Sequence, residues 1–349
     1  RYDAALRALD KMGEDSFEGI TGAVLRAWAI AGTGNFDAAF KALDRIGNGG
    51  LEEFLVFHRA LMADLAGRQS DAVKLATEAL DSDPYTVPVL ETYARVLANA
   101  GQFDKALDAI VQFEAQGLSH PAISALKLQL IAKQRPVHYV DSVQAGGAEL
   151  FHSLGVAFAR QGSNDIGLVL LRLAGYLNPR NMNVPFVIGQ LYDGAGQHEL
   201  ANAVYESVPE TSPMRPMAVV RLASNLDAMG NRAEAIRRLG NIVVSDPQNL
   251  DAVQTLADLQ RADKQYTAAI ENYTRVLAIT GGKAPADWQY YYMRGIAYER
   301  SNQLPLAETD FKQALVLNPD QPSVLNYLGY TWVDKGMHLT EALAMIQKA

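Results

Sequence analysis

Cysteine is absent from this chain of 349 residues, and its absence excludes several kinds of site at once. Disulfide bonds, thiol catalysis and zinc or iron–sulfur sites with cysteine ligands cannot form. The six histidines also lack the spacing of a zinc-binding helix, because no HxxxH or HExxH pair occurs. We therefore expect no bound metal. A chain without cysteine also suits the bacterial periplasm.

Long apolar runs and an excess of positive charge are missing as well. No run of 18 apolar residues occurs, so we expect no transmembrane helix and no direct insertion into a membrane. The 31 lysines and arginines are outnumbered by 39 acidic residues, which gives a net charge of −8 and argues against nucleic-acid binding. No nucleophile elbow or phosphate-binding glycine loop is found. The sequence predicts a chain that is not an enzyme and holds no cofactor.

A small residue recurs at a regular interval along most of the chain. In several copies it stands five residues after a turn glycine, as Ala72 follows Gly67 and Ala235 follows Gly230. A second small residue often precedes it by twelve residues, as Gly295 precedes Ala307. The recurring small residues stand at positions 5, 39, 72, 106, 167, 201, 235, 269, 307 and 342.

This rhythm predicts pairs of antiparallel helices and an all-α fold. Two small residues, one on each helix, let the helix axes approach closely. The glycine between them can take the positive φ that ends the first helix. A proline such as Pro179 or Pro247, twelve residues after the small residue, then ends the second helix.

The unit of about 34 residues resembles the tetratricopeptide (TPR) repeat, and its best copies span residues 151–179 and 291–319. The resemblance covers nearly the whole chain. It implies a right-handed superhelical TPR solenoid of about ten antiparallel helix pairs, whose first helices line a concave groove.

One interval breaks the rhythm, because the small residues at 106 and 167 are 61 residues apart. We expect a first helix over residues 121–134 and an irregular break over residues 135–147, marked by Pro136 and by Gly146-Gly147. Residues 1–134 would then form an N-terminal TPR arm and residues 148–349 a C-terminal TPR arm. The break is either drift within one repeat or a hinge or partner contact.

The resemblance also implies which side chains face the groove, since TPR families commonly point the second, fifth, ninth and twelfth residues of each unit inward. The expected groove mixes aromatic, amide and charged side chains, which suits a protein or peptide partner. Of the consecutive residues Tyr290, Tyr291 and Tyr292, we expect Tyr292 to face outward, because neighbours 100° apart cannot all enter one core. The candidate groove residues are Phe57, Glu91, Arg95, His152, Phe186, Gln190, Ser224, Gln254, Asp258, Tyr292, Asn326 and Tyr330.

The C-terminal run over residues 318–343, which contains Leu-Asn-Tyr-Leu-Gly-Tyr and Asp-Lys-Gly, is similar to proteobacterial TPR lipoproteins of the protease-adaptor type. That resemblance implies a periplasmic scaffold, tethered to the outer membrane through a lipidated N-terminus outside this sequence, which brings client proteins to a processing protease. The sequence opens and closes within helical patterns, so we expect it to be a piece of a longer chain.

Three functions therefore stay open at the level of sequence. The first is a non-catalytic adaptor that binds protein partners in the groove. The second is a structural assembly factor of a secretion, pilus or envelope complex. The third is the TPR arm of a larger enzyme whose catalytic domain lies elsewhere. Self-association into a homo-oligomer also stays open.

Overall fold

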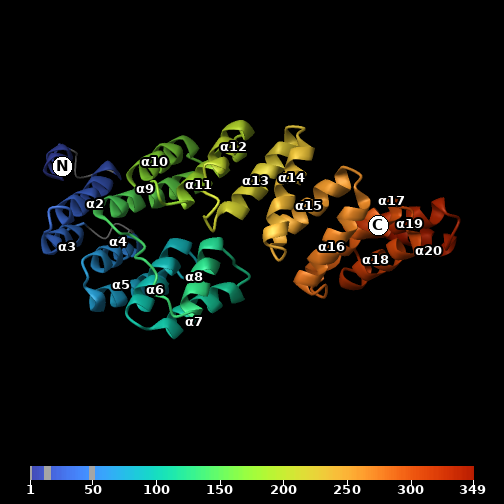
Figure 1. Cartoon of the computed structure of the whole chain (residues 1–349), viewed down its shortest axis with the longest axis horizontal. Coiled ribbons are helices and arrows are strands. Elements are labelled where there is room, and N and C mark those ends of the chain that lie inside the picture. Colours follow the sequence, from blue (N-terminus) through green and yellow to red (C-terminus); the bar gives the residue numbers. More distant parts are fainter. Residues whose placement is uncertain (1, 12–16, 47–51) are drawn as a thin grey trace. The chain divides into compact units, whose positions relative to one another are not determined.

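The computed structural model describes residues 2–11, 17–46 and 52–349, and these residues form α-helices joined by turns and one short 3₁₀ helix. The expected all-α fold of paired helices is confirmed. Two compact units divide the chain (Figure 1): unit 1 comprises residues 1–196 with 207–214, and unit 2 comprises residues 197–206 with 215–349. Among the helices that the structure describes, none combines the length and apolar character needed to cross a membrane.

Unit 1 is built from consecutive helix pairs, of which α9 and α10 pack most extensively. Its helices are α1 (Tyr2–Leu9), α2 (Phe17–Ala31), α3 (Phe36–Asp44), α4 (Glu52–Leu65), α5 (Gln69–Ser82), α6 (Val87–Asn99), α7 (Phe103–Ala115), α8 (Pro121–Ile131), α9 (Val143–Arg160), α10 (Asn164–Leu177) and α11 (Asn183–Gly194).

Unit 2 continues the same pairing. Its helices are α12 (His198–Glu206), α13 (Arg215–Ala228), α14 (Arg232–Ser245), α15 (Leu250–Ala262), α16 (Tyr266–Thr280), the 3₁₀ helix η1 (Pro285–Asp287), α17 (Trp288–Arg300), α18 (Leu304–Leu317), α19 (Pro322–Asp334) and α20 (Leu339–Lys348).

The turn within a helix pair ends the first helix on a residue with left-handed backbone conformation. Gly230 does so between α13 and α14 with a φ of +84°. Lys264 and Asn302 take the place of glycine in two later turns and keep the same conformation, with φ values of +63° and +62°. In all three turns the next amide bonds back to the carbonyl five residues earlier, which is the Schellman arrangement. The predicted turn geometry is confirmed, and in two of its copies a residue other than glycine adopts it.

The small residues of the repeat lie where paired helices touch. A Cβ on Gly155 of α9 would come within 2.8 Å of the Leu171 side chain on α10, and a Cβ on Gly167 would come within 2.9 Å of the Gly155 carbonyl oxygen. At Gly295 of α17, a Cβ would meet the Phe311 ring at 2.6 Å. Only glycine allows these helices to approach so closely, as the sequence pattern predicts.

The irregular segment is shorter than the sequence suggests. It lies between α8 and α9, and α9 already begins at Val143, so Gly146 and Gly147 are inside a helix. The expectation that these glycines punctuate an irregular piece is wrong. They lie where α9 crosses α2, and a Cβ on Gly146 would be 2.3 Å from the ring of Trp28. Here too glycine serves close helix packing.

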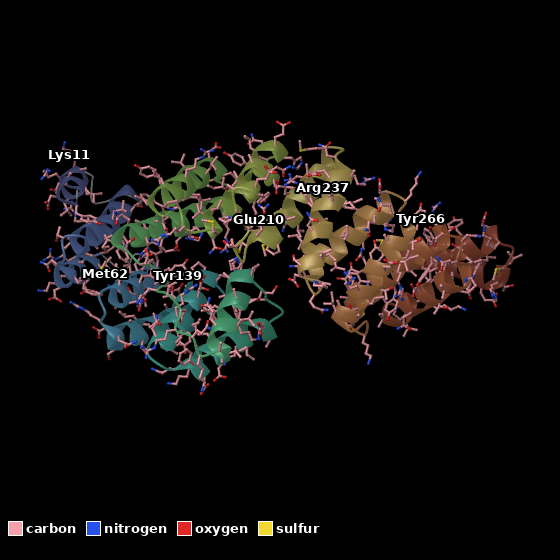
Figure 2. All side chains as sticks on the ribbon, in the orientation of Figure 1. Lys11, Met62, Tyr139, Glu210, Arg237 and Tyr266 are labelled. Atoms are coloured by element: carbon pink, nitrogen blue, oxygen red, sulfur yellow. The ribbon has the colours of Figure 1, made fainter. Side chains whose placement is uncertain are left out.

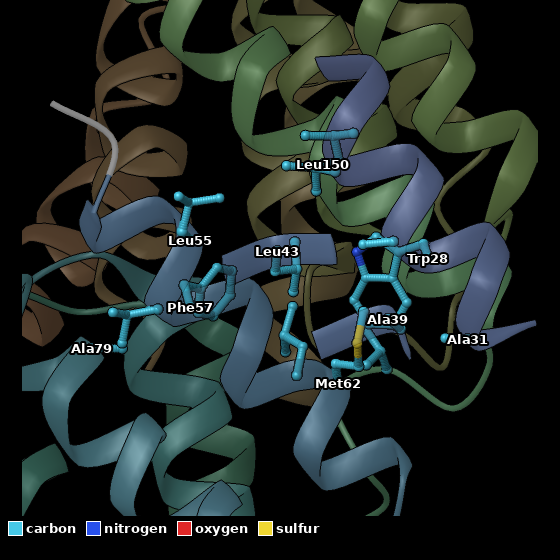
Figure 3. Packing of buried hydrophobic residues seen from close by; sticks show 14 of the residues in the cluster. Trp28, Ala31, Ala39, Leu43, Leu55, Phe57, Met62, Ala79 and Leu150 are labelled. Carbon is cyan, nitrogen blue, oxygen red and sulfur yellow. The ribbon is translucent and has the colours of Figure 1, made fainter. Parts of the chain in front are cut away.

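This crossing closes the core of unit 1 around residues that are far apart in the sequence. Figure 3 shows Trp28 of α2, Leu43 of α3, Met62 of α4 and Leu150 of α9 in one apolar cluster, and all four are buried. Residues 135–147 therefore join two parts of one compact unit, and the boundary between the compact units falls later, at residues 197–214. The division into arms at residues 1–134 and 148–349 stays a prediction.

Candidate functional site

The twelve residues expected to line a groove divide evenly between the two compact units. Unit 1 carries Phe57, Glu91, Arg95, His152, Phe186 and Gln190, and unit 2 carries Ser224, Gln254, Asp258, Tyr292, Asn326 and Tyr330.

Two of the unit 1 residues belong to the core. Phe57 and Phe186 are buried, and the Phe57 ring packs 6.5 Å from the ring of Tyr139, measured between centroids. Gln190 is exposed on α11. Phe57 and Phe186 therefore support the helices around them and offer little surface to a partner.

His152 is also buried, within a polar cluster that joins α9 to the segment before it. The Glu149 carboxylate lies 3.1 Å from Nδ1 of His152, and the Ser153 hydroxyl donates to it at 3.0 Å. The Tyr139 hydroxyl donates to its second oxygen at 3.1 Å, and Figure 2 labels Tyr139 within unit 1. Every oxygen of this buried carboxylate therefore has a partner.

The charges of this cluster stabilise one another. Burial alone would lower the pKa of His152, but the charge and hydrogen bond of Glu149 outweigh it and raise that pKa. Burial alone would raise the pKa of Glu149, but the charge and hydrogen bond of His152 and the hydrogen bond of Ser153 lower it. Burial and the Glu149 charge raise the pKa of Tyr139 well above its usual value. The cluster therefore favours a buried Glu149–His152 ion pair.

His58 of α4 differs from His152 in carrying no charge. Its ring is fully buried, and the Trp28 indole donates to its Nδ1 at 3.2 Å. Burial lowers the pKa of His58 to about 4, against a small opposing effect of Glu149. His58 therefore stays uncharged at neutral pH and packs as part of the core.

Glu91 and Arg95 line a hollow of about 350 Å³ in unit 1, between α6, α8 and the irregular segment. Nε of Arg95 donates to Glu91 at 3.1 Å, and Nη1 donates to the Val137 carbonyl oxygen at 3.0 Å. The guanidinium thus ties α6 to the irregular segment, and its charge is neutralised by Glu91.

Four side-chain amides on the walls of this hollow were not expected from the sequence. They belong to Gln129 of α8, to Asn178 and Asn181 between α10 and α11, and to Asn183 at the start of α11. Amides can both donate to and accept from a peptide backbone. Three asparagines within six residues of sequence were the available signal, but only the fold brings them opposite α8.

In unit 2, Gln254 and Asp258 are half-buried on α15 and already have partners. Gln254 accepts a hydrogen bond from the Tyr290 hydroxyl at 3.2 Å, and Asp258 accepts one from Tyr273. Burial raises the pKa of Asp258, although the bond from Tyr273 opposes this. Ser224 is exposed on α13.

Tyr292, Asn326 and Tyr330 meet at a second hollow, of about 460 Å³, between α17 and α19. Tyr330 is 61% exposed, and Asn326 is exposed beside it. Glu299 shares the hollow and accepts a hydrogen bond from the Tyr327 hydroxyl at 3.1 Å. Side chains from equivalent positions of two successive repeats therefore share one concave surface.

The three consecutive tyrosines are all half-buried, so Tyr292 is not set apart by exposure as expected. The Tyr291 hydroxyl donates to the Gly282 carbonyl oxygen at 3.1 Å. The Tyr292 ring packs against Tyr327 with centroids 5.9 Å apart. Of the three, Tyr292 is the one that lines the hollow of unit 2.

The residues that the structure describes contain no group of three or more histidine, aspartate or glutamate side chains arranged to hold a metal ion. Glu91 and Glu149 of the first hollow are paired with arginine and histidine, and Glu299 of the second accepts a hydrogen bond from a tyrosine hydroxyl. The chemistry that these surfaces offer is hydrogen bonding and aromatic contact.

Family models of the tetratricopeptide repeat match residues 220–285 and 288–321. The chain therefore contains tetratricopeptide repeats over these residues. The matched residues lie in unit 2 and include the hollow-lining residue Tyr292 and the α15 residues Gln254 and Asp258. This architecture is that of a protein-interaction scaffold.

Two human proteins are among the relatives. The chain is 23% identical to protein O-mannosyl-transferase TMTC1 of Homo sapiens over 203 residues, which is 58% of this chain and 22% of the relative. It is 23% identical to tetratricopeptide repeat protein 13 of Homo sapiens over 159 residues, which is 46% of this chain and 18% of the relative. The match therefore spans about a fifth of each relative's length.

Solved structures of similar fold include MamA, with a TM-score of 0.44 and 20% identity over 50% of this chain and 92% of that one. YrrB, described as a TPR protein with an unusual peptide-binding site, gives a TM-score of 0.42 and 14% identity over 51% of this chain and 90% of that one. The Cut9–Hcn1 hetero-tetramer of APC/C gives a TM-score of 0.44 and 16% identity over 99% of this chain and 64% of that one.

Proposed function

We propose that the chain is a non-catalytic scaffold whose first-helix face binds a segment of a partner protein. The observation that carries the proposal is the hollow of unit 2, where Tyr292 of α17 meets Asn326 and Tyr330 of α19. An exposed tyrosine ring beside an exposed amide can hold one side chain and one peptide group of a bound segment. The proposed mechanism is geometric, because binding two proteins on one rigid surface raises the local concentration of one near the other.

The finer assignment is a bacterial periplasmic adaptor that brings client proteins to an effector such as a processing protease. Its support is the similarity of residues 318–343 to proteobacterial TPR lipoproteins, together with the absence of cysteine. In this assignment an outer-membrane anchor would come from a lipidated N-terminus outside this sequence.

Selection of randomised 12-residue peptides displayed on phage, with the full chain as bait, tests the binding surface. We expect selected peptides to bind the wild type and to lose at least tenfold in affinity on Asn326→Ala/Tyr330→Ala, whose side chains are exposed and contribute little to folding. Thr309→Ala, on an exposed site of α18, is the matched control and should leave the affinity unchanged. If no peptide is enriched, or if the double variant binds them as well as the wild type, the proposal fails.

Affinity purification from envelope extracts tests the adaptor assignment. Recovery of a protease together with cell-wall hydrolases, lost in the Asn326→Ala/Tyr330→Ala variant, is the expected result. Recovery of secretion or pilus components instead would contradict the adaptor assignment and favour the assembly factor.

A second candidate is the TPR arm of a larger enzyme. The observation that favours it is the match to a relative named as an O-mannosyl-transferase, of which this chain covers only 22%. The complete reading frame tests this candidate, since it requires a catalytic domain on the same polypeptide.

A further inference from the structure

The outer face of α10 carries a stripe of four large apolar side chains in water. Ile166, Val169, Leu173 and Tyr176 are 50%, 60%, 41% and 83% exposed. Their spacing of three, four and three residues places them in one row along the helix. We call these four residues the α10 stripe. Apolar residues scattered singly over a surface need no explanation, but a continuous row is typical of an interaction site.

The second helices α5, α7, α14, α16 and α18 do not share this feature. The four stripe positions are defined by their distance from the small residue of the repeat, which is Gly167 in α10, so they can be compared across repeats. None of the equivalent sets in α5, α7, α14, α16 and α18 has more than two large apolar residues. Those sets are Asp71, Lys74, Glu78 and Asp81; Lys105, Asp108, Gln112 and Ala115; Glu234, Arg237, Asn241 and Val244; Ala268, Glu271, Arg275 and Ala278; and Leu306, Thr309, Gln313 and Val316.

This comparison shows which residues of α10 the repeat needs for packing. The repeat needs its small residues and buried positions in every copy, and α10 retains them as Gly167, Leu171 and Ala174. The same repeat architecture in α5 is compatible with charges at all four stripe positions. Folding therefore does not require the apolar side chains of the α10 stripe.

The spacing of the α10 stripe fits another helix. Rows of apolar residues three and four apart are the a and d positions of a coiled-coil seam, which a second helix fills with its own apolar row. The stripe extends from Ile166 to Tyr176, ten steps of about 1.5 Å along the helix, and its length of about 15 Å can be covered by about three turns of a partner helix.

A charge beside the stripe indicates what the partner helix carries. Arg172 lies next to Leu173 and donates to the Tyr192 hydroxyl, a neutral partner. No carboxylate lies within ion-pair distance of it among the residues that the structure describes. Two outward cations of other second helices are neutralised, Arg237 by Glu234 at 2.6 Å and Lys312 by Glu308 at 2.6 Å. At Arg172 the complement of this surface is an apolar row flanked by a carboxylate, while the exposed Asp165 beside Ile166 would be complemented by a cation.

A second copy of the chain fits this surface less well. In an antiparallel pair with Ile166 opposite Tyr176 and Val169 opposite Leu173, the Arg172 side chains of the two copies would meet at the two-fold axis and repel each other. A stable dimer also buries about 800 Å² on each partner, more than one row of side chains on a single helix provides.

We propose that the α10 stripe binds an amphipathic helix of another protein, with an apolar a/d row and an acidic residue facing Arg172. This surface lies on a second helix, apart from the proposed first-helix binding face, so the proposal goes beyond that function and adds a second partner surface. A scaffold with two such surfaces can hold a client and an effector at once.

Selection from a display library of 21-residue helix-forming peptides, with the a, d, e and g positions randomised, tests the proposal on the full chain. The stripe variant Ile166→Asp/Val169→Lys/Leu173→Glu/Tyr176→Asp gives α10 the residues of α5, which the repeat already accommodates. We expect enriched helices with apolar a and d residues and a flanking Asp or Glu, and at least a tenfold loss of affinity on the stripe variant. Leu306→Lys/Val316→Lys, at two equivalent positions of α18, is the matched control and should bind as the wild type does.

Three further measurements keep the outcomes distinct. The stripe variant must have the same helicity and melting temperature as the wild type, both measured by circular dichroism. Arg172→Glu should weaken helices with an acidic flank and strengthen their lysine-flanked counterparts. Asn326→Ala/Tyr330→Ala should leave helix binding unchanged, so that failure of the first-helix surface and failure of the α10 stripe can be told apart.

Several results would overturn the proposal. One is the absence of any helix that prefers the wild type over the stripe variant. Another is enrichment of helices that lack acidic flanks and whose affinity does not change with Arg172→Glu. Sedimentation of the wild type as a dimer and of the stripe variant as a monomer would assign the stripe to a second copy. Flotation with vesicles of phosphatidylglycerol and phosphatidylethanolamine, lost in the stripe variant, would assign it to a membrane.

Discussion

Two adjacent glycines in α9 should respond in opposite ways to the same substitution. Gly146→Ala puts a methyl group 2.3 Å from ring atoms of Trp28, which is buried and hydrogen-bonded to His58 and so cannot easily move. Overpacking of this kind costs about 1–3 kcal/mol. Replacing glycine by alanine within a helix otherwise gains about 1 kcal/mol. With the overpacking cost at its upper end, Gly146→Ala should lower the free energy of unfolding by about 2 kcal/mol.

Gly147→Ala is the matched control, because it changes the same helix by the same methyl group. Its Cβ would meet only the Leu25 side chain, at an ordinary distance of 3.8 Å. It should stabilise the protein by about 0.5–1 kcal/mol through helix propensity alone.

Urea unfolding, followed by hydrogen exchange of α2 and α9 amides, measures both variants where the helices cross. The two should differ by about 3 kcal/mol, roughly a hundredfold in the local opening equilibrium. A Gly146→Ala protein as stable as Gly147→Ala would refute the crossing of α9 on α2.

Three other perturbations test the packing and electrostatics of the repeats. Lys264→Gly should raise the free energy of unfolding by about 0.5–1 kcal/mol, since lysine is strained at a φ of +63°. Asn302→Gly should change it little, because asparagine tolerates this conformation. Thermal denaturation measures both variants. Asp310→Asn should lower the free energy of unfolding, measured in urea, by about 3 kcal/mol, because Arg294 loses the carboxylate to which it donates two hydrogen bonds of 2.8 Å. Replacing both residues, as Arg294→Met/Asp310→Leu, should recover most of that loss. The folded-state pKa of His58, about 4, lies below the unfolded value of 6.5, so the unfolded chain binds the extra proton and stability falls as the pH drops from 6.5 towards 4. Between pH 7 and pH 4.5, protonation of His58 in the unfolded chain should lower the free energy of unfolding by about 2–3 kcal/mol, and this loss should be absent in His58→Gln. A His58→Gln protein whose stability falls with pH as that of the wild type does would contradict a buried, neutral His58.

The repeat could be predicted from the sequence because its physical requirement is local and recurs. Each helix pair needs small residues at the contact and a left-handed residue at the turn, and Gly155, Gly167 and Gly230 show both requirements in the chain itself. The same reasoning misjudged Gly146 and Gly147. A glycine pair is typical of a loop, and only the crossing of α9 on Trp28, more than a hundred residues earlier in the sequence, explains it as a packing feature.

The candidate site could be predicted only in part, because repeat position fixes the direction of a side chain but not its neighbours. Tyr292, Asn326 and Tyr330 do share a hollow. Phe57 occupies an equivalent position, yet it is buried because α9 and the irregular segment cover α4. The assignment of all twelve residues to one partner-binding groove stays a prediction.

Site-specific photo-crosslinking in the cells that make this protein tests the central claim most directly. A photoreactive phenylalanine analogue is placed at Asn326, in the hollow of unit 2, or at Thr309, an exposed position on the second helix α18. The account predicts one or a few discrete protein adducts from position 326 and none of the same mass from position 309. Identical adduct patterns from both positions, or none from position 326, would contradict a scaffold that binds partners on its first-helix face.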